Sequence, residues 1–326
     1  MVLRWNPVGM TIAGISGIRG NTSKHLRLPW DLVVDWSYNL YVTDRDNHRV
    51  QKFLRGSTDG ITIAGNGTPS MSPETLKYPT GIYIDINNDI YVADRDYHRT
   101  QLYTNGSSFG LTIVGNGMLN TTEICILHSV LGSFGSAIDQ LYYPYSLQGD
   151  SNTGMLYITD HTNYRITCYQ FTNGSMSIVA GGNGPGLNTT QLWNPHAVFF
   201  DAVSNNLFIA NAQANNIVRW TLGANEWTLV VGYMNGSSGN TSTTFNYQSD
   251  VMLDPMGNVY VSDRRNHRIQ CFMNGESNGR TIAGVVENMG NDSTLLNGPS
   301  SIALDGQLNL YVVDQNNHRI QKFLRY

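Results

Sequence analysis

Short apolar stretches alternate with polar turns along the whole chain, and one such stretch recurs. Its first copy, residues 40–53, reads Leu-Tyr-Val-Thr-Asp-Arg-Asp-Asn-His-Arg-Val-Gln-Lys-Phe. A fixed period of tens of residues is typical of repeat architectures, in which each unit buries its apolar faces against its neighbours. The six copies end at Phe53, Tyr103, Tyr169, Trp220, Phe272 and Phe323, which gives steps of 50, 66, 51, 52 and 51 residues.

Each repeat predicts four strands. Residues 40–43 and 50–53 are rich in β-branched and aromatic side chains, which favour strands, and the polar residues between them form a hairpin loop. Residues 29–35 predict a strand before this hairpin, and residues 61–64 predict one after a Gly-containing turn. Four short antiparallel strands in each of six repeats are typical of a β-propeller. The alternative, an open solenoid, would need atypical polar repeats as caps.

The two ends of the chain complement each other. The last repeat stops after its third strand, and residues 10–13 read as a fourth strand that has no repeat of its own. We predict an all-β, six-bladed propeller of four-stranded antiparallel blades, closed by this N-terminal outer strand and formed as a single domain by residues 1–326. Closure in this way removes most of the exposed sheet edge. Residues 2–5 resemble the end of a third strand, and they either compete with the C-terminal strand or fray.

The hairpin loops resemble NHL repeats, which are named for an Asn-His-Leu signature. The triplets at residues 47–49, 266–268 and 317–319 read Asn-His-Arg, and residues 97–99 read Tyr-His-Arg. The resemblance implies a six-bladed propeller, in agreement with the number of repeats. It does not choose a function, because the family includes peptide-amidating lyases, sensor ectodomains and the substrate-binding ends of tripartite-motif ubiquitin ligases.

The recurring charged residues have a structural interpretation. The Asp that ends each second strand faces the Arg that follows the hairpin loop, so the two should form a charge-assisted pair. The His before this Arg should bridge to the loop of the neighbouring blade. Metal binding by these His residues is the alternative interpretation, but equivalent residues on different blades radiate around the ring and do not converge on one point. Repeat four carries Asn at these positions and repeat three carries Tyr164, so we expect weaker locking there. The structural set comprises Asp44, His48, Arg49, Asp94, His98, Arg99, Asp160, Arg165, Asp263, His267, Arg268, Asp314, His318 and Arg319.

Two rings of side chains could contact a ligand, since function on propellers lies in loops and at the channel mouth. The first position of each hairpin loop forms a mildly basic rim, which we expect to be solvated. The rim comprises Arg45, Arg95, His161, Arg264 and Gln315. The start of each innermost strand should line the channel mouth, where the ligand-binding candidates are Trp30, Asp31, Tyr145, His196 and Asp250.

The channel candidates include two carboxylates and a His near one axis. Such a group could hold a cation, for example calcium, or a cationic ligand. No other cofactor is predicted, no metal ligands are assigned, and no residue is assigned as catalytic. The connection from Thr112 to Pro144 carries the one large insertion, whose apolar residues 124–132 form either a binding lid or local packing. It contains Cys125, whose candidate disulfide partner is Cys168; three reduced thiols are the alternative.

Composition limits the classes of partner and the cellular compartment that we expect for this chain. Only 13% of residues are charged and the net charge is −4, unlike the basic footprint of nucleic-acid binders. No apolar run approaches the roughly 18 residues of a membrane span, and residues 1–20 lack the apolar core of a signal peptide. Glycosylation acceptors would indicate an extracellular glycoprotein, although chance alone predicts about five or six of them. If they are coincidental, a cytoplasmic location remains open. The nine candidates are Asn21, Asn66, Asn105, Asn120, Asn173, Asn188, Asn235, Asn240 and Asn291.

The sequence therefore favours a non-catalytic binding scaffold, a monomeric extracellular domain or ectodomain of a longer protein that binds a protein or a glycan. The first alternative is a metal-dependent lyase or hydrolase resembling the peptide-amidating lyases, which would need a metal-binding cluster from Asp31, His196 and Asp250. The second is a substrate-recognition propeller like that of tripartite-motif ubiquitin ligases, although the chain has no RING or coiled coil to accompany it.

Overall fold

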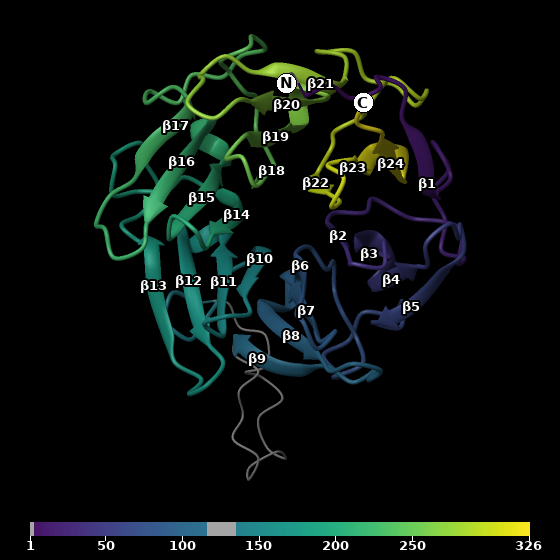
Figure 1. The fold of residues 1–326 in the computed structure, drawn as a ribbon. Helices are drawn as coiled ribbons and strands as arrows, with labels where there is room; N and C mark the ends of the chain where they lie inside the picture. The colour runs from purple at the N-terminus through teal and green to yellow at the C-terminus, as the bar shows by residue number, and fades with distance from the viewer. Residues whose placement is uncertain (1–2, 116–134) are drawn as a thin grey trace.

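Six four-stranded antiparallel sheets surround a central axis in the computed structural model, which describes residues 3–115 and 135–326 (Figure 1). In five of the sheets, the strands follow chain order from the axis outward. The structure confirms the predicted six-bladed propeller, and the blades are numbered here in chain order.

The first three blades follow one another from the N-terminal side. Blade 1 contains β2 (Leu32–Val34), β3 (Leu40–Asp44), β4 (Arg49–Phe53) and β5 (Gly60–Ala64). Blade 2 contains β6 (Ile82–Ile84), β7 (Ile90–Asp94), β8 (Arg99–Tyr103) and β9 (Leu111–Gly115). Blade 3 contains β10 (Pro144–Asp150), β11 (Met155–Asp160), β12 (Arg165–Gln170) and β13 (Met176–Gly181).

The last three blades complete the ring. Blade 4 contains β14 (Pro195–Asp201), β15 (Asn206–Asn211), β16 (Asn216–Thr221) and β17 (Thr228–Gly232). Blade 5 contains β18 (Asp250–Leu253), β19 (Val259–Asp263), β20 (Arg268–Phe272) and β21 (Arg280–Gly284). Blade 6 contains β22 (Ser301–Leu304), β23 (Leu310–Asp314) and β24 (Arg319–Phe323), with β1 (Met10–Gly14) as its outer strand.

The N-terminal strand closes the ring as the sequence predicts. β1 pairs antiparallel with β24, with Met10 opposite Lys322, and Figure 1 shows the two strands side by side. Before β1, Trp5 forms an isolated antiparallel bridge with Arg325, and its indole N–H donates to the carbonyl of Leu308 at 2.9 Å. Residues 3–5 therefore extend the seam beyond β24, and neither competition with that strand nor fraying describes them.

A 3₁₀ turn forms each hairpin loop between the second and third strands. The residue after the turn has a left-handed backbone, with φ of 54° at His48 and 49° at Asn215. Because the turn geometry recurs, this residue occupies the same place in every blade. The six turns are η1 (Arg45–Asn47), η2 (Arg95–Tyr97), η3 (His161–Asn163), η4 (Ala212–Ala214), η5 (Arg264–Asn266) and η6 (Gln315–Asn317).

The core lies between neighbouring blades. Between blades 3 and 4, for example, one buried cluster combines Tyr157 and Ile166 with Val198 and Leu207. Fully burying side chains of this size stabilises the fold by about 1.5–3 kcal/mol each. Each blade is therefore held by its two neighbours, which fixes the positions of the inner strands around the axis.

Candidate functional site

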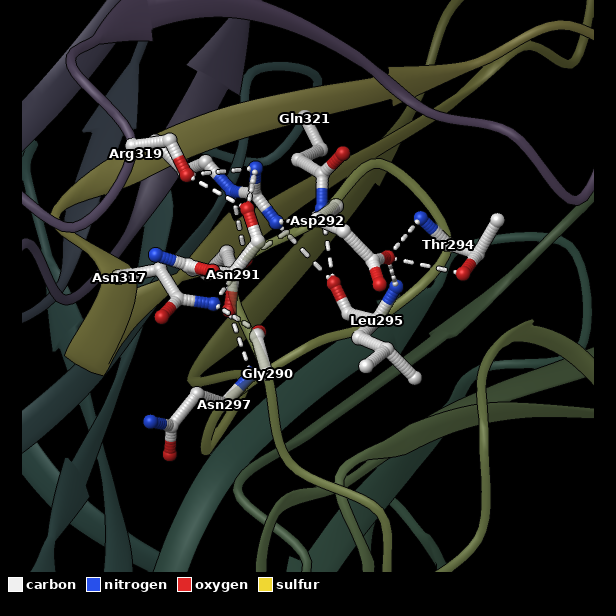
Figure 2. Close-up of polar contacts among 11 residues, drawn as sticks. Gly290, Asn291, Asp292, Thr294, Leu295, Asn297, Asn317, Arg319 and Gln321 are labelled. Atoms are coloured by element: carbon white, nitrogen blue, oxygen red, sulfur yellow. Dashed lines mark hydrogen bonds and ion pairs between the residues drawn. The ribbon is translucent and has the colours of Figure 1, made fainter.

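An ion pair locks each charged hairpin to the loop before its blade, and Figure 2 shows this lock in blade 6. Arg319 Nε donates to Asp314 Oδ2 at 2.8 Å. The same guanidinium donates to the backbone carbonyls of Asn291, Asp292 and Leu295, which lie in the loop between β21 and β22. The lock therefore ties the two kinds of loop on this face of the propeller together.

Five blades contain this ion pair, and its carboxylate side chain is fully buried in each. Burial raises the pKa of Asp94 to about 6, against the opposing effect of the Arg99 guanidinium. The pairs are part of the scaffold and offer no free charge to a ligand. They are Asp44–Arg49 at 2.8 Å, Asp94–Arg99 at 2.7 Å, Asp160–Arg165 at 2.7 Å, Asp263–Arg268 at 2.8 Å and Asp314–Arg319 at 2.8 Å.

The histidines of the hairpins bridge neighbouring blades, as the sequence suggests. Nδ1 of His48 accepts the backbone N–H of Tyr78 at 3.2 Å, and Nδ1 of His318 accepts that of Leu28 at 3.2 Å. His98 and His267 accept equivalent bonds from blades 3 and 6. An accepting Nδ1 must be unprotonated, and burial lowers the pKa of both His48 and His318 accordingly.

Blade 4 replaces the ionic lock with a neutral one. Asn211 Nδ2 donates to Asn216 Oδ1 at 3.2 Å, in place of the Asp–Arg pair. Asn215 Oδ1 accepts the backbone N–H of Tyr247 at 2.9 Å, in place of the histidine. The connections survive without charge, so blade 4 has not lost its lock. In blade 3, Tyr164 takes the left-handed position but supplies no ring nitrogen to accept such a bond.

The hairpin ring is not the solvated rim that the sequence suggested. The guanidinium carbons of Arg45 and Arg264 lie 5.5 and 5.4 Å from the Trp30 ring centre, and that of Arg95 lies 5.1 Å from the ring of Tyr145. Gln315 is 1% exposed and accepts a hydrogen bond from Arg264 at 2.7 Å. These side chains turn inward, over the end of the channel.

Three large rings fill the axis beneath these cations. Tyr145 stacks on His196 with ring centres 4.8 Å apart, and Trp30 packs against Tyr145 at 5.2 Å. In the other three blades, a small hydroxyl residue lies one or two positions before the inner strand and bonds to a neighbouring backbone carbonyl. These are Thr80, Ser249 and Ser300. We call the cluster of Trp30, Arg45, Arg95, Tyr145, His161, His196, Tyr247 and Arg264 the axial mouth.

His196 is the central polar group of the axial mouth. Its side chain is 2% exposed, and neither ring nitrogen has a hydrogen-bond partner among the described residues. Its ring also lies 5.1 Å from that of His161 and 4.9 Å from that of Tyr247. Burial, followed by the nearby His161 and Arg264, lowers the pKa of His196, so the imidazole is neutral near pH 7.

Asp31 and Asp250 belong to a second layer, inside the channel. Both line a cavity of about 190 Å³ whose other walls are largely apolar. Burial raises the pKa of Asp31 to about 6, and burial together with the charge of Asp31 raises that of Asp250 to about 7. Ser301 Oγ donates to Asp31 Oδ1 at 2.6 Å. In the described part of the chain no three His, Cys, Asp or Glu side chains gather as a metal site, so Asp31, His196 and Asp250 do not form one.

One member of the axial mouth, Tyr247, and one residue beside it, Arg265, escaped the sequence analysis. Tyr247 contacts His196, and the guanidinium carbon of Arg265 lies 4.3 Å from the Tyr247 ring centre. The sequence does hold a signal for Tyr247, because a Tyr also precedes the inner strand in two other repeats, at positions 78 and 143. Both of those tyrosines likewise lie under an arginine, Tyr78 under Arg45 and Tyr143 under Arg95.

The remaining predictions concern the surface and the thiols. Asn120 and the insertion at residues 124–132, which contains Cys125, lie outside the described residues, so the lid and the Cys125–Cys168 disulfide stay predictions. Cys168 is buried, with its sulfur 3.3 Å from that of Met155. The other eight glycosylation candidates are all exposed. No described helix is long and apolar enough to cross a membrane.

Comparisons with known proteins agree with the repeat and the fold. Residues 26–53, 245–272 and 296–323 match the NHL repeat. Over 206 residues the chain is 27% identical to Protein SUPPRESSOR OF QUENCHING 1, chloroplastic, of Arabidopsis thaliana, a match that covers 55% of this chain and only 19% of that protein.

Solved propellers with different activities share the fold. An auxiliary nutrient binding protein from Bacteroides ovatus superposes with a TM-score of 0.67 at 15% identity, over 100% of this chain and 78% of that one. A gluconolactonase from Xanthomonas campestris superposes with a TM-score of 0.63 at 10% identity, over 98% and 99% of the two chains. At such identities the similarity shows the fold alone, and it includes both binding proteins and enzymes.

Proposed function

For a six-bladed propeller with NHL repeats, we propose a non-catalytic binding scaffold that holds its ligand at the axial mouth. The observation that carries this proposal is convergence: Trp30, Tyr145 and His196 come from three blades and meet under Arg45, Arg95 and Arg264. Aromatic and arginine side chains dominate the energetics of binding surfaces. The fold positions this cluster rigidly, so little ordering opposes binding.

The ligand we propose is a protein or a glycan met outside the cell, with this chain acting as an ectodomain. Exposure of the eight described acceptor asparagines supports this compartment, because glycosylation requires an accessible side chain. Expression in a secreting eukaryotic host, followed by mass spectrometry, tests it. Occupied glycans at several of these positions support the proposal, and a secreted protein without any glycan contradicts it.

Binding at the axial mouth is tested by probing the purified propeller against glycan arrays and extracellular protein extracts. The variant Arg95→Ala removes one cation at the mouth, and Trp36→Ala is the matched control. Trp36 is 97% exposed in the turn between β2 and β3, at the opposite end of β3 from the hairpin loop. We expect Arg95→Ala to weaken binding about tenfold or more, with no change for the control. The reverse pattern would move the site to the other face.

The carboxyl pair in the channel favours a second, separate role, which is to bind a cation such as calcium. Asp31 and Asp250 share one cavity, and their raised pKa values mean that protons compete with a cation near neutral pH. Calorimetric titration with calcium at pH 6 and pH 8 tests this. We expect binding to be tighter at pH 8 and to disappear in Asp250→Asn. Equal affinity at both pH values would contradict the role of this pair.

The enzymatic alternative, a lyase or hydrolase, loses the metal cluster that the sequence suggested, because Asp31, His196 and Asp250 do not gather as one among the described residues. The specific observation in its favour is that the two channel carboxyls have pKa values raised to about 6 and 7, which suit proton transfer near neutral pH. Turnover of a lactone or ester panel that Asp31→Asn abolishes would favour this alternative over the scaffold.

A further inference from the structure

We propose that the axial mouth recognises an anionic group, a carboxylate or a sulfate, carried by an acidic oligosaccharide. This inference rests on the proposed function, and it specifies the chemistry of the ligand. Three features of the mouth support it: unbalanced positive charge, buried polar atoms without partners, and half-buried tyrosines beside the cations.

Positive charge accumulates at the mouth without full compensation. Arg95 pairs with Asp96 at 2.9 Å, but the nearest carboxylate oxygen to Arg45 is 3.9 Å away, on Asp46. Arg264 donates a hydrogen bond to the side-chain oxygen of Gln315, and no carboxylate lies within ion-pair distance of it among the described residues. Arg45 and Arg264 both lie over one indole, that of Trp30. An anion between these two cations would relieve their mutual repulsion.

Hydrogen-bonding atoms at the mouth are left without partners. The Nε atoms of Arg45, Arg95 and Arg264 are buried and have no hydrogen-bond partner among the described residues, and the same holds for both ring nitrogens of His196. A buried polar group without a partner costs about 1–3 kcal/mol. Several such groups in one cluster indicate a built recognition site, because a bound group with several oxygens can accept from the guanidinium N–H groups and from the one N–H that the neutral His196 ring carries.

The surroundings favour a sugar as the carrier of the charge. Tyr78, Tyr143 and Tyr247 are half-buried and lie next to the arginines, so that each presents an apolar ring beside a cation. A pyranose ring has apolar C–H faces that can pack on such rings while its charged substituent reaches a guanidinium. The side chain of Arg45 is 23% exposed, so this layer is accessible from solvent.

Calorimetry with three oligosaccharides of equal length tests the proposal: one with glucuronate, one with sulfate and one neutral. We expect saturable binding of one or both acidic sugars, at least tenfold tighter than the neutral one. The double variant Arg45→Gln/Arg264→Gln should weaken binding of the acidic sugar about tenfold or more. The control Arg55→Gln/Arg219→Gln removes the same charge from exposed positions outside the mouth and should change little.

The outcomes separate this proposal from the broader one. Equal weakening by both double variants would show non-specific electrostatic attraction and overturn the inference. Preference for the neutral sugar, or for an acidic peptide over all three sugars, would also overturn the inference. In either case, binding that is weakened by Arg95→Ala would still support the proposed scaffold function. Thermal melts of each variant show whether it is folded, and Arg45→Lys/Arg264→Lys, which keeps the charge but loses the planar fork, serves if the glutamine variant unfolds.

Discussion

Blades 4 and 6 hold the same hairpin in the same place by different means. Blade 6 uses a buried Asp314–Arg319 ion pair, whereas blade 4 uses a hydrogen bond between Asn211 and Asn216. In both blades the left-handed residue accepts a backbone N–H from the next blade, through His318 or Asn215. The difference teaches that the geometry of this repeat requires a donor facing an acceptor, and that charge is one way of supplying them.

The largest effect should come from breaking the charged lock. Arg319→Ala leaves Asp314 buried without its cation, which should lower the free energy of unfolding by about 3–5 kcal/mol. Urea denaturation measures this loss. Arg219→Ala, at an exposed position of β16, should cost less than about 0.5 kcal/mol. If the two variants are equally stable, the blade 6 pair is solvated and contributes no lock.

Adding a charge to the neutral lock of blade 4 should lower the free energy of unfolding by somewhat less than Arg319→Ala does. Asn211→Asp places a buried carboxyl opposite Asn216, and we expect a loss of about 2–3 kcal/mol at pH 8. Burial raises the pKa of the equivalent Asp94 to about 6, so the folded variant should bind a proton more tightly than the unfolded chain does. The loss should therefore shrink as pH falls from about 6 towards 4. A loss that does not depend on pH would show that the new carboxyl is solvated.

Importing the neutral lock into blade 6 sharpens the comparison. The double variant Asp314→Asn/Arg319→Asn removes both charges together and should lose about 1–2 kcal/mol, because no charge is left buried alone. It should thus be more stable than Arg319→Ala in the same urea experiment. A double variant that is as unstable as the single one would mean that the contacts of Arg319 with the loop carbonyls, and not the charge balance, dominate the lock.

The smallest effect at neutral pH concerns the inter-blade acceptors. The triple variant His48→Asn/His267→Asn/His318→Asn adopts the blade 4 solution and should change stability at pH 7.5 by less than about 1 kcal/mol.

Acid should separate this variant from the parent. The histidine pKa values are lowered by burial in the folded state, so the parent should lose stability as pH falls below about 6.5, the unfolded value. The variant should lose less, and thermal melts between pH 7.5 and 4.5 measure the difference. Identical acid sensitivity in the two proteins would contradict the role of the histidines as neutral acceptors.

The locks could be predicted from the sequence because they are local. Asp44 and Arg49 flank one tight hairpin, and their strand register follows from its length. The sequence predicted most members of the axial mouth as two separate rings, but their convergence could not be predicted, because it depends on side-chain direction between distant blades. Arg45 and Arg264 lie far apart in the chain, yet both turn over Trp30. A repeat pattern places such residues on one ring, but it does not say whether they point to solvent or to the axis.

The pairing of β1 with β24 has a consequence for folding kinetics. The two strands come from opposite ends of the chain, so their contact closes the longest loop in the molecule and has a large entropic cost. Contacts between successive blades close much shorter loops and should form earlier. We therefore expect the seam in blade 6 to form late, when the other blades have already brought the two ends together, and to be an early place for the ring to open under denaturing conditions.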